Sequence, residues 1–225
     1  MLQAIVFDFD GVIANSEPLH FRAFRDVLAE RGVDLTEPDY YTRYLGYDDL
    51  GAFREIAKDR GRTWSSADLA ALTGHKAARM EALERDASVL FPGAADAIRR
   101  AAAAVPIAIA SGALGAEIRR VLEGANLTHH FVAIVSAEDT AAGKPAPDPY
   151  RRAVALIAEA TGNSLAPGTC VAIEDSRWGI ASARAAGLRT VGVTSSYDAG
   201  ELAGADLIIG SLADLDIDGL RRMLG

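Results

Sequence analysis

The chain has 225 residues, of which half are hydrophobic, and its formal net charge is −8 at pH 7. This length suits one large domain or a core with a smaller inserted or appended domain, and the negative charge argues against nucleic acid or an anionic membrane as a partner. Cys170 is the only cysteine, there is no signal pattern, and no apolar run approaches the ~20 residues of a membrane helix, so we expect a cytoplasmic protein without an internal disulfide.

The first predicted element is a strand at Ala4–Phe9, which begins with the apolar run AIVF. Such a run is typical of a strand that is covered on both faces. The strand ends in two carboxylates, Asp8 and Asp10, and Gly11 then favours a bend. In an extended chain the two carboxylates would lie on the same side and repel each other, and a divalent cation would relieve the repulsion. The pair alone is equally consistent with aspartates that cap a turn.

A helical block follows this strand. Apolar residues recur at helical spacing from Leu19 to Leu28, and we expect Gly32 to cap this helix. From Asp34 to about Ala87 the sequence is polar and charged with helical periodicity, and no alternating strand pattern interrupts it. A helical block of this size, placed directly after the first strand of an α/β unit, indicates a small inserted domain.

After residue 93 the chain alternates regularly between helices and strands. The expected helices are 94–104, 116–123, 149–160 and 178–186, and the expected strands are 105–110, 132–135, 170–173, 190–193 and 207–209. This alternation predicts a parallel sheet with right-handed crossovers. We therefore predict an α/β fold with a Rossmann-like parallel sheet core at residues 1–15 and 90–225. A small α-helical cap domain is expected at residues 16–89.

Polar side chains follow three of the predicted strands. They are Asp8 and Asp10 after the first strand, Ser111 and Gly112 after the second, and Glu174 and Asp175 after the strand that Cys170 opens. Lys144 lies in GKPAPDP, which is too rich in proline to be helical. Ligands bind beyond the carboxyl ends of such strands, so we expect these groups to converge on one edge of the sheet. We expect Cys170 itself to be a buried structural thiol.

The chemistry that suits this set of groups is phosphoryl transfer. Mg²⁺ prefers oxygen ligands, so Asp8, a backbone carbonyl and Asp175 could hold it. A carboxylate can attack phosphorus to give an aspartyl phosphate, which water then hydrolyses. Lys144, Ser111 and the backbone amide of Gly112 would neutralise the phosphoryl oxygens as charge develops on them.

These motifs resemble those of the haloacid dehalogenase superfamily. DFDGV, the apolar strand that ends in Ser111, Lys144 in GKPAPDPY, and Glu174-Asp175 in EDSRWGI match its four motifs in order and in kind. Within the superfamily, the chain is similar to the group with a small helical cap that includes phosphoglycolate phosphatases and β-phosphoglucomutases. The resemblance covers essentially the whole chain.

The resemblance implies a role for each matched residue. Asp8 would be the nucleophile and a Mg²⁺ ligand, and Asp10 the general acid and base, with its backbone carbonyl also on the metal. Ser111, Gly112 and Lys144 would bind the transferred phosphoryl group. Asp175 would be a metal ligand, and Glu174 would bind the metal directly or through water. Asp10 favours phosphate chemistry, because the dehalogenases of the superfamily lack this second aspartate.

The cap residues bear on the choice of substrate. The resemblance implies substrate contacts from Ser16, His20 and Lys76, although a lysine on a polar helix is usually solvated and a helix histidine can simply have a partner. Asp49 falls where the mutases place a phosphate-gripping arginine, and a carboxylate there would repel phosphate. This substitution disfavours a mutase, although Arg43 and Arg54 lie nearby in the sequence.

Several aromatic residues have no role implied by the motifs. Trp178 follows the EDS motif, and we expect it to pack into the fold. The tyrosines of one cap segment are expected to pack between helices, with a sugar-binding platform as the alternative. They are Tyr40, Tyr41, Tyr44 and Tyr47.

Three functions follow from these observations. The first is a Mg²⁺-dependent phosphatase that acts on a small phosphorylated metabolite, as a monomer or weak homodimer. The second is a sugar-phosphate mutase, which would require a sugar bisphosphate. The third is a non-catalytic phosphoacceptor similar to response-regulator receivers, but receivers have about half this length and no cap. We expect the phosphatase.

Overall fold

The structure is a computed structural model that describes residues 1–45, 47–86 and 89–225. The chain forms two compact units. The first consists of Met1–Asn15 and Val89–Gly225, and the second of Ser16–Ser88. Across the described ranges, no helix combines the length and the hydropathy that a membrane span needs.

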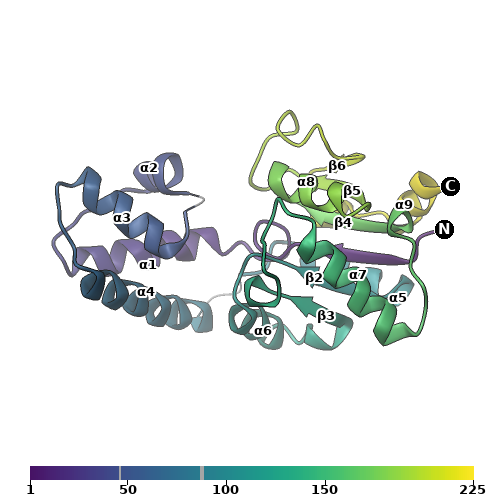
Figure 1. The fold of residues 1–225 in the computed structure, drawn as a ribbon, viewed down its shortest axis with the longest axis horizontal. Helices are drawn as coiled ribbons and strands as arrows, with labels where there is room; N and C mark the ends of the chain where they lie inside the picture. Colours follow the sequence, from purple (N-terminus) through teal and green to yellow (C-terminus); the bar gives the residue numbers. More distant parts are fainter. Residues whose placement is uncertain (46, 87–88) are drawn as a thin grey trace. The chain divides into compact units, whose positions relative to one another are not determined.

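A six-stranded sheet forms the centre of the first unit (Figure 1). The strand order is β3-β2-β1-β4-β5-β6, and every neighbouring pair is parallel. The strands are β1 (Ala4–Phe7), β2 (Ile107–Ala110), β3 (Phe131–Val135), β4 (Cys170–Glu174), β5 (Arg189–Val193) and β6 (Leu207–Ile209). The predicted parallel sheet is confirmed, including the short strand at 207–209.

Strand β1 lies between β2 and β4, in the interior of the sheet. Its four residues are fully buried, as expected for a strand covered on both faces. The sequence analysis predicted that this strand ends at Phe9, but it ends at Phe7. The carbonyl of Phe9 accepts the N–H groups of Ile13 and Ala14 at 2.8 and 2.9 Å, so the backbone turns directly after Asp8.

Helices cover both faces of the sheet. They are α5 (Ala94–Ala104), α6 (Gly115–Gly124), α7 (Asp148–Thr161), α8 (Arg177–Ala185) and α9 (Ile217–Leu224). From β1 the chain first moves to β2 and β3 and later crosses back to β4 and β5, so right-handed crossovers place α5 and α6 on one face and α7 and α8 on the other. Helix α7 lies in front of the sheet in Figure 1.

The sequence did not predict helix α9. It is short, and among its apolar residues only Leu220 is buried. Its first turn depends on Asp216, whose side chain accepts the N–H of Asp218 at 3.0 Å. The helix has only eight residues, about two turns, and so short a segment is hard to identify in the sequence even when its apolar residues share one face.

The described residues of the second unit form helices joined by turns and loops, without a strand. Its helices are α1 (Glu17–Ala29), α2 (Glu37–Asp39), a π-helical turn η1 (Tyr40–Tyr44), α3 (Asp49–Asp59) and α4 (Ser66–Asp86). Their buried faces share one apolar core that includes Phe24, Phe53 and Leu72. The predicted end of the helical block, near Ala87, lies outside the described residues.

Two details of the helical unit refine the sequence analysis. Helix α1 ends at Ala29, and Gly32 terminates it as expected, because the N–H of Gly32 donates to the carbonyl of Ala29 and the N–H of Val33 to that of Leu28, both at 3.0 Å. Gly32 lies in the following turn with φ +65°, a conformation that glycine adopts without strain. Tyr40 and Tyr44 are buried in the unit's core, which confirms the expected packing, whereas half of the Tyr47 side chain is exposed.

The first unit closes on itself where the Ser16–Ser88 segment departs and returns. Ala14 forms an antiparallel bridge with Leu90. The N–H of Asn15 donates to the carbonyl of Val89 at 2.6 Å. The two ends of the segment are therefore tied together by backbone hydrogen bonds.

Cys170 opens β4 and is fully buried, as the sequence predicted. Burial raises the pKa of its thiol to about 11. At pH 8 only ~0.1% of the thiol is then ionised, against roughly a quarter for an ordinary cysteine. We expect iodoacetamide to leave the folded protein unmodified at pH 8 and to alkylate it in urea, as read by intact mass. Rapid alkylation without urea would contradict the buried position.

Candidate active site

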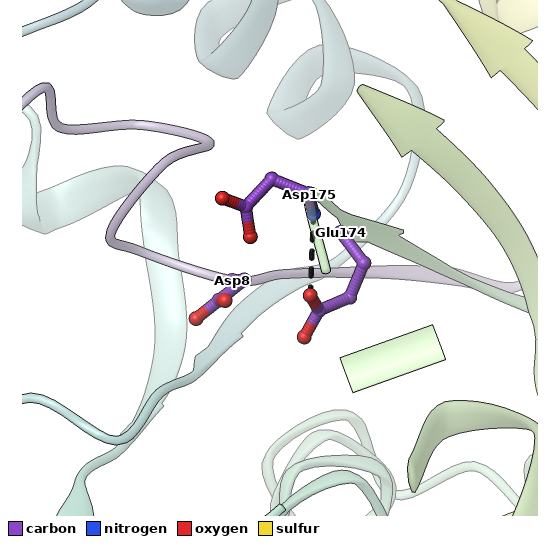
Figure 2. A group of neighbouring side chains, drawn as sticks. All are labelled: Asp8, Glu174 and Asp175. Carbon is purple, nitrogen blue, oxygen red and sulfur yellow. Dashed lines mark hydrogen bonds between the residues drawn. The ribbon is translucent and has the colours of Figure 1, made fainter. Parts of the chain in front are cut away.

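Three carboxylates meet at the carboxyl edge of the sheet. Asp8 follows β1, Glu174 ends β4, and Asp175 is the next residue. Because β1 and β4 are adjacent, with Phe7 paired to Ile173, these residues leave the sheet side by side. Each offers an oxygen atom, and these three oxygens lie within 4.8 Å of one another. Figure 2 shows the three side chains gathered at this edge.

The cluster is almost closed to solvent. Asp8 and Asp175 are 8% and 7% exposed, and Glu174 is fully buried. Burial, and then the charge of Glu174, raise the pKa of Asp8 well above its ordinary value. The same two causes raise the pKa of Asp175 to about 6. Burial and mutual repulsion therefore disfavour the ionised forms of Asp8 and Asp175.

Lys144 supplies one positive charge to this cluster. Its Nζ lies 2.8 Å from Asp8 Oδ1 and 2.5 Å from Glu174 Oε1. Burial disfavours the ammonium form, but the two carboxylates outweigh it and raise the pKa of Lys144 above its ordinary value. Lys144 is therefore a cation that the loop before α7 holds against Asp8.

The donor set fits a divalent cation. One lysine faces three buried carboxylates, so the group remains negative by about one to two charges. Carboxylate oxygens are the ligands that Mg²⁺ prefers, and a second cation would oppose the burial and repulsion that now raise the pKa values of Asp8 and Asp175. The geometry thus supports a metal site at Asp8, Glu174 and Asp175.

Glu174 is held at both of its carboxylate oxygens. Oε1 accepts hydrogen bonds from Lys144 and from the phenol of Tyr150, the latter at 2.7 Å. Oε2 accepts the N–H of Asp175 at 3.2 Å, which Figure 2 draws as a dashed line, and the hydroxyl of Ser176 at 3.2 Å. A Cβ at Gly179 would lie 1.8 Å from Oε1, so this glycine leaves the space that the carboxylate occupies.

Gly11 allows the loop after β1 to approach Asp175. Its φ is +75°, and a Cβ there would lie 1.8 Å from Asp175 Oδ2. The loop after β5 also contributes, because the Ser195 hydroxyl donates to the carbonyl of Gly11. A hydrogen bond with Ser196 opposes the rise in the pKa of Asp175.

Asp10, Ser111 and Gly112 occupy the same edge of the sheet. Ser111 and Gly112 follow β2, the other neighbour of β1. Ser111 is 3% exposed, and its hydroxyl accepts the N–H of Ala113 at 3.1 Å. Gly112 is exposed, and a Cβ there would meet nothing within 4 Å. Asp10 is half-buried in the turn after Asp8, and its side chain is not one of the three clustered carboxylates.

The helical unit contains a second polar cluster. Lys76 Nζ lies 2.8 Å from Asp49 Oδ1 and 2.7 Å from His20 Nδ1. Lys76 is 3% exposed, so the interpretation of a solvated lysine is wrong, and His20 does have a partner. Ser16, at the start of α1, is also buried. Asp49, which we expected at the position of the mutases' arginine, is therefore paired with the lysine on the facing helix.

The expectation that Trp178 packs into the fold is wrong. Its side chain is 44% exposed, and the Arg177 guanidinium lies 4.3 Å from the centre of its ring. The nearest aromatic ring is Tyr197, at 6.1 Å between centroids. Trp178 is in the first turn of α8, which begins at the open edge of the sheet, so little of the fold is available to cover it.

Sequence reasoning missed the groups that hold the cluster. These are Tyr150, Gly179, Ser195 and Ser196. Tyr150 is the last residue of GKPAPDPY and Gly179 lies in EDSRWGI, so both were within the matched motifs but carried no chemical signal of their own. Ser195 and Ser196 follow β5, and only the position of that strand next to β4 identifies them.

Comparisons with known proteins identify the family of this chain. The family model of haloacid dehalogenase-like hydrolases matches residues 2–187. The chain is 37% identical to Protein CbbY of Rhodobacter capsulatus over 212 residues, which cover 89% of this chain and 88% of that protein. It is 32% identical to the fructose-1-phosphate phosphatase YqaB of Escherichia coli K12 over 200 residues, which cover 84% and 95%.

Solved structures share this fold. A crystal structure of a CbbY mutant from Rhodobacter sphaeroides in complex with xylulose-1,5-bisphosphate has a TM-score of 0.81 and 29% identity, and covers 98% of this chain and 99% of that chain. The chain therefore belongs to the haloacid dehalogenase-like hydrolase family. The resemblance inferred from the four motifs is confirmed.

Proposed function

We propose that this enzyme is a Mg²⁺-dependent phosphatase of a small sugar phosphate and works through an aspartyl-phosphate intermediate. The observation that carries the proposal is the contact between Lys144 and Asp8 beside two further buried carboxylates. A nucleophilic carboxylate needs a neighbouring cation to accept a phosphoryl group, and the lysine is already in place. Family membership supports the same chemistry.

In the first step an oxygen of Asp8 attacks phosphorus, and the bond from phosphorus to the sugar oxygen breaks. Asp10 gives its proton to the leaving oxygen. In the second step water attacks the phosphorus of the aspartyl phosphate, Asp10 takes a proton from that water, and Asp8 is released with phosphate. Asp10 is two residues after the nucleophile, on the turn that Gly11 permits.

Other residues of the sheet edge bind the transferred group. Lys144, the Ser111 hydroxyl and the amide of Gly112 neutralise and orient the phosphoryl oxygens. Asp8, Glu174, Asp175 and the backbone carbonyl of Asp10 would hold the metal. Bound Mg²⁺ supplies positive charge that offsets the phosphate and the carboxylates.

The substrate class follows from the relatives and from the helical unit. One relative is a fructose-1-phosphate phosphatase, and a solved CbbY structure contains a sugar bisphosphate. We propose that the helical unit is the cap domain and that Ser16, His20 and Lys76 face the sugar. Asp49 pairs with Lys76 and partly cancels its positive charge. The helical unit would therefore attract a second phosphate group less strongly than it would with an arginine at position 49. This pairing favours a phosphatase over a mutase.

The test is phosphate release from a panel of phosphomonoesters. The panel contains fructose 1-phosphate, xylulose 1,5-bisphosphate, phosphoglycolate, a nucleotide and β-glucose 1-phosphate, each with Mg²⁺ and with EDTA. We expect rapid release from a sugar phosphate with Mg²⁺, a loss of activity in EDTA, and recovery when excess Mg²⁺ is added. Release that continues unchanged in EDTA would rule out the metal.

The panel also separates the phosphatase from the mutase. A mutase would convert β-glucose 1-phosphate to the 6-phosphate only when glucose 1,6-bisphosphate is added, with little net release of phosphate. That result would mean that Asp49 does not prevent the binding of a second phosphate.

A further inference from the structure

Tyr150 lies in the first turn of α7 and has no role among the motif residues assigned above. The residue is fully buried and belongs to the apolar core cluster that also contains Val6 and Ala172. Its hydroxyl reaches the polar edge and donates to Glu174 Oε1 at 2.7 Å. A phenylalanine would fill the same apolar space, so the packing of the ring does not explain the hydroxyl.

The hydroxyl of Tyr150 is one of two donors on the same oxygen. The other donor is Lys144, which also contacts Asp8 at 2.8 Å. In the proposed reaction Lys144 must also serve the oxygens of the incoming phosphoryl group. Its hydrogen bond to Glu174 is therefore shared among several acceptors, whereas Tyr150 contacts Glu174 alone among the carboxylates of the cluster.

We propose that Tyr150 is a positioning residue that fixes the carboxylate of Glu174 for Mg²⁺ while Lys144 turns to the phosphoryl group. This inference rests on the proposed function. Glu174 Oε2 is held by the N–H of Asp175 and the hydroxyl of Ser176. Tyr150 completes the set on the other oxygen, so the carboxylate keeps one orientation at every stage of the reaction.

The test compares Tyr150→Phe with a matched control, Tyr44→Phe. Tyr44 is also a buried tyrosine whose phenol donates to a carboxylate, Asp59 Oδ2, at 2.8 Å, but this pair lies in the helical unit. Each variant loses one hydroxyl and one hydrogen bond, so melting temperatures in EDTA should fall by similar, small amounts. Any difference in metal affinity then reports on the position of the hydroxyl.

We measure Mg²⁺ binding by isothermal titration calorimetry in the absence of substrate. Tyr150→Phe should raise the Mg²⁺ dissociation constant about 10-fold, which is typical when a group that orients a metal ligand is removed. Tyr44→Phe should leave it unchanged. At saturating Mg²⁺, kcat of Tyr150→Phe should return to within about 2-fold of the wild type, because the site is then occupied and the ion itself orients Glu174.

The outcomes separate this inference from the proposed function. If wild-type protein binds Mg²⁺ and hydrolyses a sugar phosphate, but Tyr150→Phe has the wild-type dissociation constant, Tyr150 has no positioning role and the proposed function stands. If the wild type binds no Mg²⁺, both fail. Equal losses of metal affinity in Tyr150→Phe and Tyr44→Phe would indicate a general loss of stability and would also overturn the inference.

Discussion

Asp8→Asn is expected to lower kcat by about 10⁴-fold or more and to leave the protein folded. The amide has nearly the same volume as the carboxylate but is a far weaker nucleophile, and it also removes one proposed metal ligand. The measurement is steady-state release of phosphate from the best substrate of the panel. Turnover near the wild-type rate would exclude Asp8 as the nucleophile.

The stability of Asp8→Asn provides an independent control. The fold raises the pKa of Asp8, so at neutral pH the wild type pays a cost in stability to keep this group ionised. The amide removes that charge, and in EDTA the variant should melt at or above the wild-type temperature. Addition of Mg²⁺ should raise the melting temperature of the wild type more than that of the variant. A variant that melts well below the wild type in EDTA would make its inactivity uninformative.

Lys144→Met is expected to lower kcat by roughly 10²- to 10³-fold, the usual effect of removing one group that stabilises developing charge. Methionine keeps much of the lysine's apolar stem but has no ammonium. Asp8 then faces the phosphoryl group without its neighbouring cation. Phosphate release at saturating Mg²⁺ measures the loss. An unchanged kcat would assign the neutralisation of the phosphoryl oxygens to another group.

The same substitution should destabilise the fold when no metal is present. Without Lys144, three buried carboxylates have no cation, and breaking such a buried pair costs about 3 kcal/mol of unfolding free energy. Urea unfolding in EDTA measures this cost, and Mg²⁺ should recover part of it. The control is Lys58→Met, which removes an exposed pair with Glu55 and should change stability by less than about 1 kcal/mol. Equal effects of the two substitutions would contradict the buried cluster.

Most of the sheet could be predicted because its strands have short, strongly apolar sequences. β6 and α5 were predicted with the bounds that the structure shows, Leu207–Ile209 and Ala94–Ala104. Ends that depend on local hydrogen bonds were harder to predict. The first strand stops at Phe7 because the carbonyl of Phe9 is used in a turn, and periodicity contains no information about that turn.

The charged residues of the site could be predicted from the sequence. They could be identified from residue type and position, and the structure brings them together. The three carboxylates Asp8, Glu174 and Asp175 follow predicted strands, and Lys144 lies in a proline-rich loop. Lys76 was harder to interpret, because a lysine on a polar helix looks solvated until Asp49 and His20 are seen around it.

Residues that act by contact alone could not be found from the sequence. The role of a tyrosine or a glycine depends on which side chain lies opposite, and Tyr150 is separated from Glu174 by 24 positions. Trp178 shows the converse, because a large apolar residue in an amphipathic helix suggests burial, but its position at the edge of the sheet leaves it exposed.

The hydrogen bond between Asn15 and Val89 makes the helical segment a removable module. Its two ends already meet, so a short turn could replace Ser16–Ser88 without a large entropy cost and without breaking a single strand pairing. Insertion, exchange or enlargement of this segment leaves the carboxylate cluster on the sheet intact. Under the proposed role of this segment as a cap, substrate choice and phosphoryl chemistry can evolve separately on the same chain, and a designer could graft a new helical segment onto this core.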